Sequence, residues 1–149
     1  MVKGGYRMTE DRFQYEFIMW FGQKYPEYNN HLFEVNNNPK NEIHGAHRKS
    51  MGMKKNVSDL ILLQPKTGKM VGIELKAPGS NWPKQKIENQ LNWGKELIKN
   101  SSFYIISSNM ELLKEFTIAI IENNIFVANN LVTKSIQYIE NQKGKTINF

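Results

Sequence analysis

The chain has 149 residues, of which 40% are hydrophobic and 23% charged, as expected for one domain with its own hydrophobic core. Its net charge of +6 suits a polyanionic partner, although many basic proteins bind no nucleic acid. Without cysteine it cannot form disulfides or thiolate metal sites. Because it also lacks a membrane-length apolar run and a signal-like start, we expect it in the cytoplasm.

The helices and strands follow from hydrophobic periodicity and from turn residues. A helix begins after Thr9, which can cap it, and Phe13, Phe17 and Phe21 recur on one face. An Asn-rich loop is expected over 36–41. In chain order the pattern predicts helix 10–24, strand 31–35, helix 42–51, strands 59–63 and 70–76, helix 82–99, strand 103–106 and helix 110–122.

The pattern is weaker after residue 122. Short strands are expected over 125–127 and 135–139, where β-branched and aromatic residues gather. Strands that alternate with helices predict an α/β fold, with a mixed central β-sheet flanked by α-helices. We find no internal repeat and no long linker, so residues 1–149 are expected to form a single domain.

Three charged residues come together in the predicted hairpin of 59–63 and 70–76. Side chains alternate along a strand, so Glu74 and Lys76 share a face. The turn near Thr67 brings Asp59 opposite them, within a residue or two. Two carboxylates and one ammonium group therefore converge at one end of the hairpin.

Paired carboxylates repel unless a cation compensates them. A divalent ion that prefers oxygen ligands, Mg²⁺ or Mn²⁺, suits Asp59 and Glu74, with the backbone carbonyl of Leu75 as a further ligand. Lys76 is placed to orient an attacking water or to neutralise charge on a phosphate. The alternative is an ordinary surface ion pair. The apolar residues around Glu74 and Lys76 favour the functional interpretation, because burying an unpartnered charge is costly.

At this point the sequence resembles a known family. Ser58-Asp59, fifteen residues before Glu74-Leu75-Lys76, is similar to the PD-(D/E)XK nuclease signature. The approach to the aspartate over 51–60 and a helix carrying Gln90 narrow the resemblance to the virus-type replication-repair nuclease (VRR-NUC) branch. The likeness covers about 9–122 and leaves 123–149 as an extension. Serine at 58 replaces the proline of the motif, and Asn56 stands where glycine is usual.

The resemblance implies a role for each residue of the motif. Asp59 and Glu74 would hold the metal, Lys76 would assist the water, and Gln90 would lie near the site. A glutamate from the first helix also serves the family's site. Glu10 is preferred for it, and Glu16, six residues further on, stays open. Glu10 alternatively only compensates the helix dipole.

Several residues near the motif are candidates for binding DNA. Two tryptophans can stack on bases; Trp82 is the better candidate, whereas packing on the sheet explains Trp93. His44 and His47 have no third partner for zinc. Six basic residues flank the predicted site in the sequence. They either follow a DNA backbone or form a solvated charged surface. They are Arg48, Lys49, Lys54, Lys55, Lys84 and Lys86.

The resemblance implies a restriction-endonuclease-like core and hydrolysis of DNA phosphodiester bonds with Mg²⁺ or Mn²⁺. It further implies a phage-encoded, structure-specific endonuclease that cuts branched or Holliday-junction DNA during repair or recombination. Two symmetric cuts in a junction need a C2 homodimer. A catalytically silent nucleic-acid-binding module and an interaction or anti-defence protein on the same scaffold are the alternatives, because fold alone does not fix function.

Overall fold

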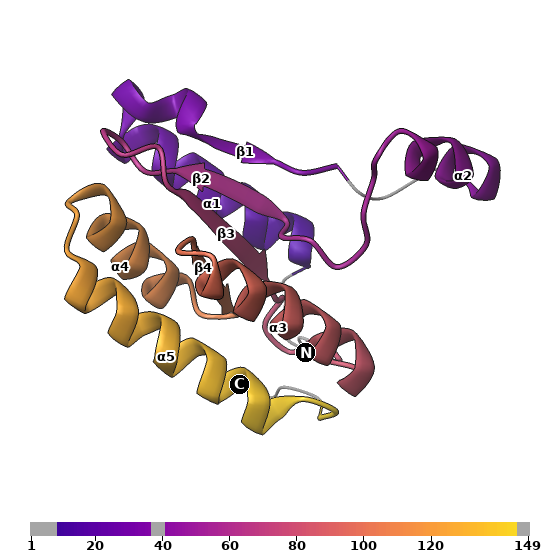
Figure 1. The fold of residues 1–149 in the computed structure, drawn as a ribbon. Coiled ribbons are helices and arrows are strands. Elements are labelled where there is room, and N and C mark those ends of the chain that lie inside the picture. Colours follow the sequence, from indigo (N-terminus) through magenta and orange to yellow (C-terminus); the bar gives the residue numbers. More distant parts are fainter. Residues whose placement is uncertain (1–8, 37–40, 146–149) are drawn as a thin grey trace, which may run out of the picture.

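The computed structural model describes residues 9–36 and 41–145 and forms one four-stranded sheet with helices on both faces (Figure 1). Each element predicted up to residue 122 lies within two residues of its observed bounds. The elements are α1 (Glu10–Lys24), the 3-10 helix η1 (Pro26–His31), β1 (Leu32–Glu34), α2 (Glu42–Ser50), β2 (Leu60–Leu63), β3 (Met70–Leu75), α3 (Lys84–Lys99), β4 (Phe103–Ser107), α4 (Met110–Ile121) and α5 (Ile125–Gln142).

The strands lie side by side in chain order, β1-β2-β3-β4. The first three are antiparallel, and β4 joins β3 in parallel through the crossover helix α3. The β2–β3 hairpin pairs Leu60 with Ile73 and Ile61 with Gly72. The predicted mixed sheet is therefore confirmed, and its register fixes which residues share a face with the motif.

The two faces of the sheet are covered by different helices. On one face the buried phenylalanines of α1, Phe13, Phe17 and Phe21, pack with residues of all four strands, α4 and α5. On the other face α3 packs over β4 and contributes Ile87 and Leu91 to a second cluster. The helices thus hold β3 at the centre of the molecule, with its carboxyl end held between α1 and α3.

The C-terminal segment corrects the prediction of two short strands. Residues 125–142 form the single helix α5, which Asn124 caps by accepting from the Val127 backbone N–H at 3.3 Å. Its buried residues recur at helical spacing: Ala128, Leu131, Val132, Ser135 and Ile139. Short runs of β-branched and aromatic residues resemble strands. Over the whole segment, however, the buried residues recur every three or four positions, and this spacing and the Asn124 cap favour a helix.

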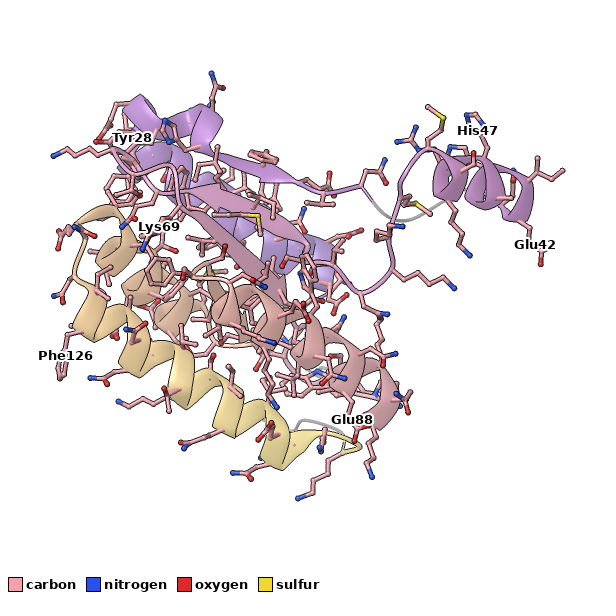
Figure 2. The ribbon with its side chains drawn as sticks, in the orientation of Figure 1. Tyr28, Glu42, His47, Lys69, Glu88 and Phe126 are labelled. Atoms are coloured by element: carbon pink, nitrogen blue, oxygen red, sulfur yellow. The ribbon has the colours of Figure 1, made fainter. Side chains whose placement is uncertain are left out.

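Helix α2 projects away from the sheet and its covering helices (Figure 1). Its side chains Glu42 and His47 stand far from the body (Figure 2). Asn41 caps the helix by accepting from the His44 backbone N–H at 2.7 Å, and residues 37–40 of the predicted Asn-rich loop lie outside the described residues. No helix in the described part of the chain is long and apolar enough to cross a membrane.

Candidate active site

The β2–β3 hairpin brings Asp59 and Glu74 together. Asp59 directly precedes Leu60, which pairs with Ile73, so the two acids are neighbours across the hairpin. The backbone N–H of Leu75 donates to Asp59 Oδ2 at 2.8 Å. This hydrogen bond fixes the Asp59 carboxylate beside the strand end where Glu74 lies.

Glu74 and Lys76 are both buried, with 3% of each residue exposed. Glu74 Oε1 accepts from Gln90 Nε2 at 2.7 Å and lies 3.5 Å from Lys76 Nζ. Its other oxygen, Oε2, is buried and has no hydrogen-bond partner among the described residues, and the same holds for Gln90 Oε1. A buried acceptor that the protein leaves unsatisfied is costly unless something else binds it.

Burial raises the pKa of the Asp59 carboxyl, although the hydrogen bond from Leu75 opposes the effect. Burial also raises the pKa of Glu74 well above its ordinary value, and the neighbouring Asp59 raises it further, while Lys76 lowers it. The charge of Asp59 is thus one cause of the raised pKa of Glu74. Two neighbouring acids of this kind need either a bound proton or a cation between them.

The structure separates the two candidate glutamates of α1. Glu10 raises the pKa of both Asp59 and Glu74 through its charge, and it lines a cleft together with Lys76. Glu16 instead forms an ion pair with Arg12, one turn before it, at 3.1 Å. Of the two, only Glu10 faces the site.

The cleft beside the site has a volume of about 370 Å³. Glu10 and Lys76 line it from α1 and from the end of β3, and Lys86 lines it from α3. A phosphate in this cleft would meet two ammonium groups. Of the cluster, Lys76 therefore faces the cleft, and neither Asp59 nor Glu74 lines it.

The donor set at the site fits a divalent ion that keeps some of its waters. No group of three or more His, Cys, Asp or Glu side chains near enough to hold a metal occurs within 9–36 and 41–145, so Glu10 does not complete a three-carboxylate cage. Two carboxylates with one unsatisfied oxygen, Glu74 Oε2, match the preference of Mg²⁺ for few protein ligands, with waters and phosphate as the others.

The loop before Asp59 accounts for both departures from the family motif. Asn56 has φ of 64°, a left-handed conformation that glycine favours and asparagine tolerates best among other residues. Ser58 is fully buried, and its Oγ accepts from the Trp93 indole N–H at 3.2 Å. A Cβ added at Gly72 would lie 2.4 Å from Ser58 Oγ, so glycine there makes room for the serine.

The link between Ser58, Gly72 and Trp93 was missed in the sequence. A glycine inside an otherwise apolar strand signals a close approach by another group. The sequence does not say which group approaches, since Trp93 lies on a helix 35 residues after Ser58.

The predicted DNA-binding lysines and arginine lie in two groups. Arg48 and Lys49 belong to the projecting helix α2, and Lys54 and Lys55 follow in the exposed loop that returns to β2. On α3, Lys86 lines the cleft, whereas the exposed Lys84 lies 4.0 Å from Glu88. One lysine of each group lies near the hairpin end that carries Asp59, because Lys54 lines a hollow with Ser58 and Lys86 lines the cleft with Lys76.

Trp82 is not available to stack on a base, which corrects the prediction made for it. It is 1% exposed, its indole N–H donates to Ser80 Oγ at 2.8 Å, and its ring meets Tyr138 of α5 edge-on. The Gly144 backbone N–H also donates to the Trp82 carbonyl at 2.7 Å. The C-terminal segment covers this tryptophan. Because the sequence predicted short strands rather than the helix α5 there, it gave no sign that Tyr138 would cover Trp82.

Comparison with known proteins supports the fold. The sequence matches no protein-family model and no curated protein. The structure is similar to a solved "VRR_NUC domain protein" with a TM-score of 0.56 and 19% identity, over 74% of this chain and 83% of that one. The chain therefore has the fold of a VRR_NUC domain protein, as its motifs predicted.

Proposed function

We propose that the protein is a metal-dependent nuclease that hydrolyses DNA phosphodiester bonds. The observation that carries the proposal is the cluster of the half-buried Asp59 with the buried Glu74 and Lys76, in which Glu74 Oε2 has no hydrogen-bond partner among the described residues. A stable fold gains nothing from a buried acid placed beside a second, half-buried one. A divalent ion bound between the two carboxylates would neutralise their charges and account for the arrangement.

Asp59, Glu74 and the Leu75 carbonyl would hold Mg²⁺ or Mn²⁺. When bound, such an ion supplies Lewis acidity toward a water and toward the scissile phosphate. Lys76, held 3.5 Å from Glu74, orients the attacking water or neutralises charge on the phosphate. Gln90 holds the Glu74 carboxylate through its 2.7 Å hydrogen bond and so acts as a positioning residue.

The proposed substrate is branched DNA, such as a Holliday junction, in phage DNA repair or recombination. Lys86 lines the cleft beside Lys76, and Lys54 lines a hollow beside Ser58, an arrangement suited to phosphates on both sides of a cut. A junction cut symmetrically needs two active sites, so we propose a C2 homodimer. A monomer in light scattering at micromolar concentration contradicts the dimer.

A cleavage assay tests this function. The protein is incubated with Mn²⁺ and junction, flap, single-stranded and linear duplex DNA, with Glu74→Ala and a chelator as controls. Cleavage that favours the junction and disappears in both controls supports the full proposal. Equal cleavage of all four substrates removes the preference for branched DNA but keeps the nuclease. Binding without cleavage points instead to a silent DNA-binding module.

A further inference from the structure

The sheet carries a second concave feature on the face that bears Asp59 and Glu74. A groove of about 290 Å³ opens beside Ser58, the residue before Asp59. Ile61 lines it and pairs with Gly72, which lies two residues before Glu74 on β3. Since residues two apart on a strand share a face, the groove and the acids lie on the same side of the sheet.

The groove is mainly apolar, with one aromatic side chain and one lysine at its edge. Trp93 of α3 borders it, and Lys54, which is exposed, lies at its edge. Within the part of the chain that the structure describes, Trp20 and Trp82 each form a stacked or edge-on pair with another aromatic ring, whereas Trp93 forms no such pair. Trp93 is half-buried and also packs against the hydrophobic cluster between α3 and β4. The apolar side chains that line the groove, all half-buried, are Val35, Met53, Val57, Ile61 and Met70.

We propose that this groove binds an unpaired nucleobase of the DNA substrate, which stacks against Trp93. The inference rests on the proposed function for its ligand and adds what the protein recognises in a branched structure. A base has an apolar face for Trp93, and its phosphate is attracted by Lys54. A base in a paired duplex is already stacked on both faces, so only an unpaired or extruded base can enter.

The position of the groove fits a nucleotide near the scissile bond. Ser58 and Asp59 are consecutive, so their Cα atoms are about 3.8 Å apart. A nucleotide whose phosphate lies at Asp59 and Glu74 can therefore place its own base, or that of a neighbour, in the groove. We reject a second copy of the chain as the occupant. A stable interface between copies needs roughly 800 Å² of surface on each partner, which is far more than this small hollow can bury. A lysine, Lys54, also borders the hollow.

Binding measurements in a non-cleaving Glu74→Gln background test the proposal. Fluorescence anisotropy compares a paired duplex, the same duplex with a few unpaired thymines, and a third in which abasic residues replace those thymines. The abasic version keeps the phosphates and removes the bases. We expect the thymines to bind about tenfold more tightly than the abasic residues. We expect Trp93→Leu to bind the thymine-containing and the abasic DNA equally tightly and to leave the affinity for the paired duplex unchanged.

Two further variants separate stacking from a structural role of Trp93. Trp93→Phe keeps a ring but loses the N–H that Ser58 accepts, and Ser58→Ala removes the acceptor and keeps the indole. Both retain most of the thymine preference if the ring binds the base. If both lose it as fully as Trp93→Leu does, Trp93 acts only through its bond to Ser58, and the proposal fails. A Trp93→Leu variant whose molecular mass in solution changes identifies the groove as a contact between copies, which also overturns it.

A measurement on the Glu74→Gln chain without further substitution covers the case in which Trp93→Leu does not fold. A 4-thiothymidine at the unpaired position is crosslinked by light, and the adduct is located by mass spectrometry. Adducts at Met53, Met70 or Trp93 support the groove, and adducts only outside it overturn the proposal. Because the DNA stays uncleaved in this background, the base preference and the nuclease activity can each fail without the other.

Discussion

Gln90 Nε2 lies 2.7 Å from Glu74 Oε1 and ties α3 to the end of β3 within the candidate site. We expect Gln90→Ala to weaken the apparent affinity for Mn²⁺, or the rate, by about 10-fold to 100-fold, because the variant frees the Glu74 side chain. Cleavage rates measured over a range of Mn²⁺ concentrations check this. Circular dichroism shows whether the fold is kept, and unchanged kinetics in a folded variant contradict the role of Gln90.

The two glutamates of α1 offer a matched comparison. Glu10→Gln is expected to lower the cleavage rate by about tenfold, as losses beside a metal site commonly do, because Glu10 acts on the charges of Asp59 and Glu74. Glu16→Gln removes the same charge six residues further along α1, where it only breaks the pair with Arg12, and this variant should cut DNA at nearly the normal rate. Equal rates for both variants assign no function to Glu10.

Metal binding should stabilise the folded chain. An ion that binds only the folded state raises the free energy of unfolding by about 2.7 kcal/mol at a hundred times its dissociation constant. Thermal melts with and without Mn²⁺ measure this for the wild type, Asp59→Asn and Glu74→Gln. We expect a shift in the wild type and little in the two variants. The exposed acid Asp11 supplies the control, since Asp11→Asn should shift as the wild type does.

The metal-free protein should lose stability as the pH rises. In the folded chain the pKa of Glu74 is raised above its ordinary value of 4.5, mainly by burial. Between these two values the folded chain holds a proton that the unfolded chain has released, so the free energy of unfolding falls with increasing pH. The loss is about 1.4 kcal/mol for each tenfold difference between the two dissociation constants.

Denaturation with a chelator present, at several pH values, measures this dependence. Glu74→Gln keeps an acceptor for Gln90 but removes the buried acid, so its stability should fall less steeply above pH 4.5. The variant should then be more stable than the wild type in mildly alkaline buffer while it cuts no DNA. Parallel curves for the two proteins rule out Glu74 as the cause.

The projecting helix α2 should contribute affinity rather than chemistry. Replacing Arg48 and Lys49 by alanine is expected to weaken binding to every DNA substrate, and to reduce the slope of affinity against salt by about 0.9 for each phosphate that the variant no longer neutralises. Anisotropy titrations at several salt concentrations measure both effects. The control replaces Lys66 and Lys99, exposed at the opposite end of the sheet, and should change neither. An unchanged salt slope in the α2 variant excludes α2 from the interface.

Local patterns in the sequence were enough to predict the helices and strands from α1 to α4, except the 3-10 helix η1, and the meeting of Asp59 with Glu74. Both depend on information that neighbouring residues carry, namely hydrophobic period, helix caps and a short turn, and a hairpin of known turn position leaves little freedom in its register. The likeness of 51–60, Glu74-Leu75-Lys76 and Gln90 to one nuclease family predicted the fold that the comparison then supported.

What packs on these elements became known only from the folded chain. Packing buried Trp82 under Tyr138, joined Ser58 to Trp93, and turned Glu10 rather than Glu16 toward the acids. Each outcome depends on contacts between residues far apart in the chain or on the direction of one helix face. Neither composition nor spacing carries that information, because burial is settled by the partner that covers a side chain and not by the side chain itself.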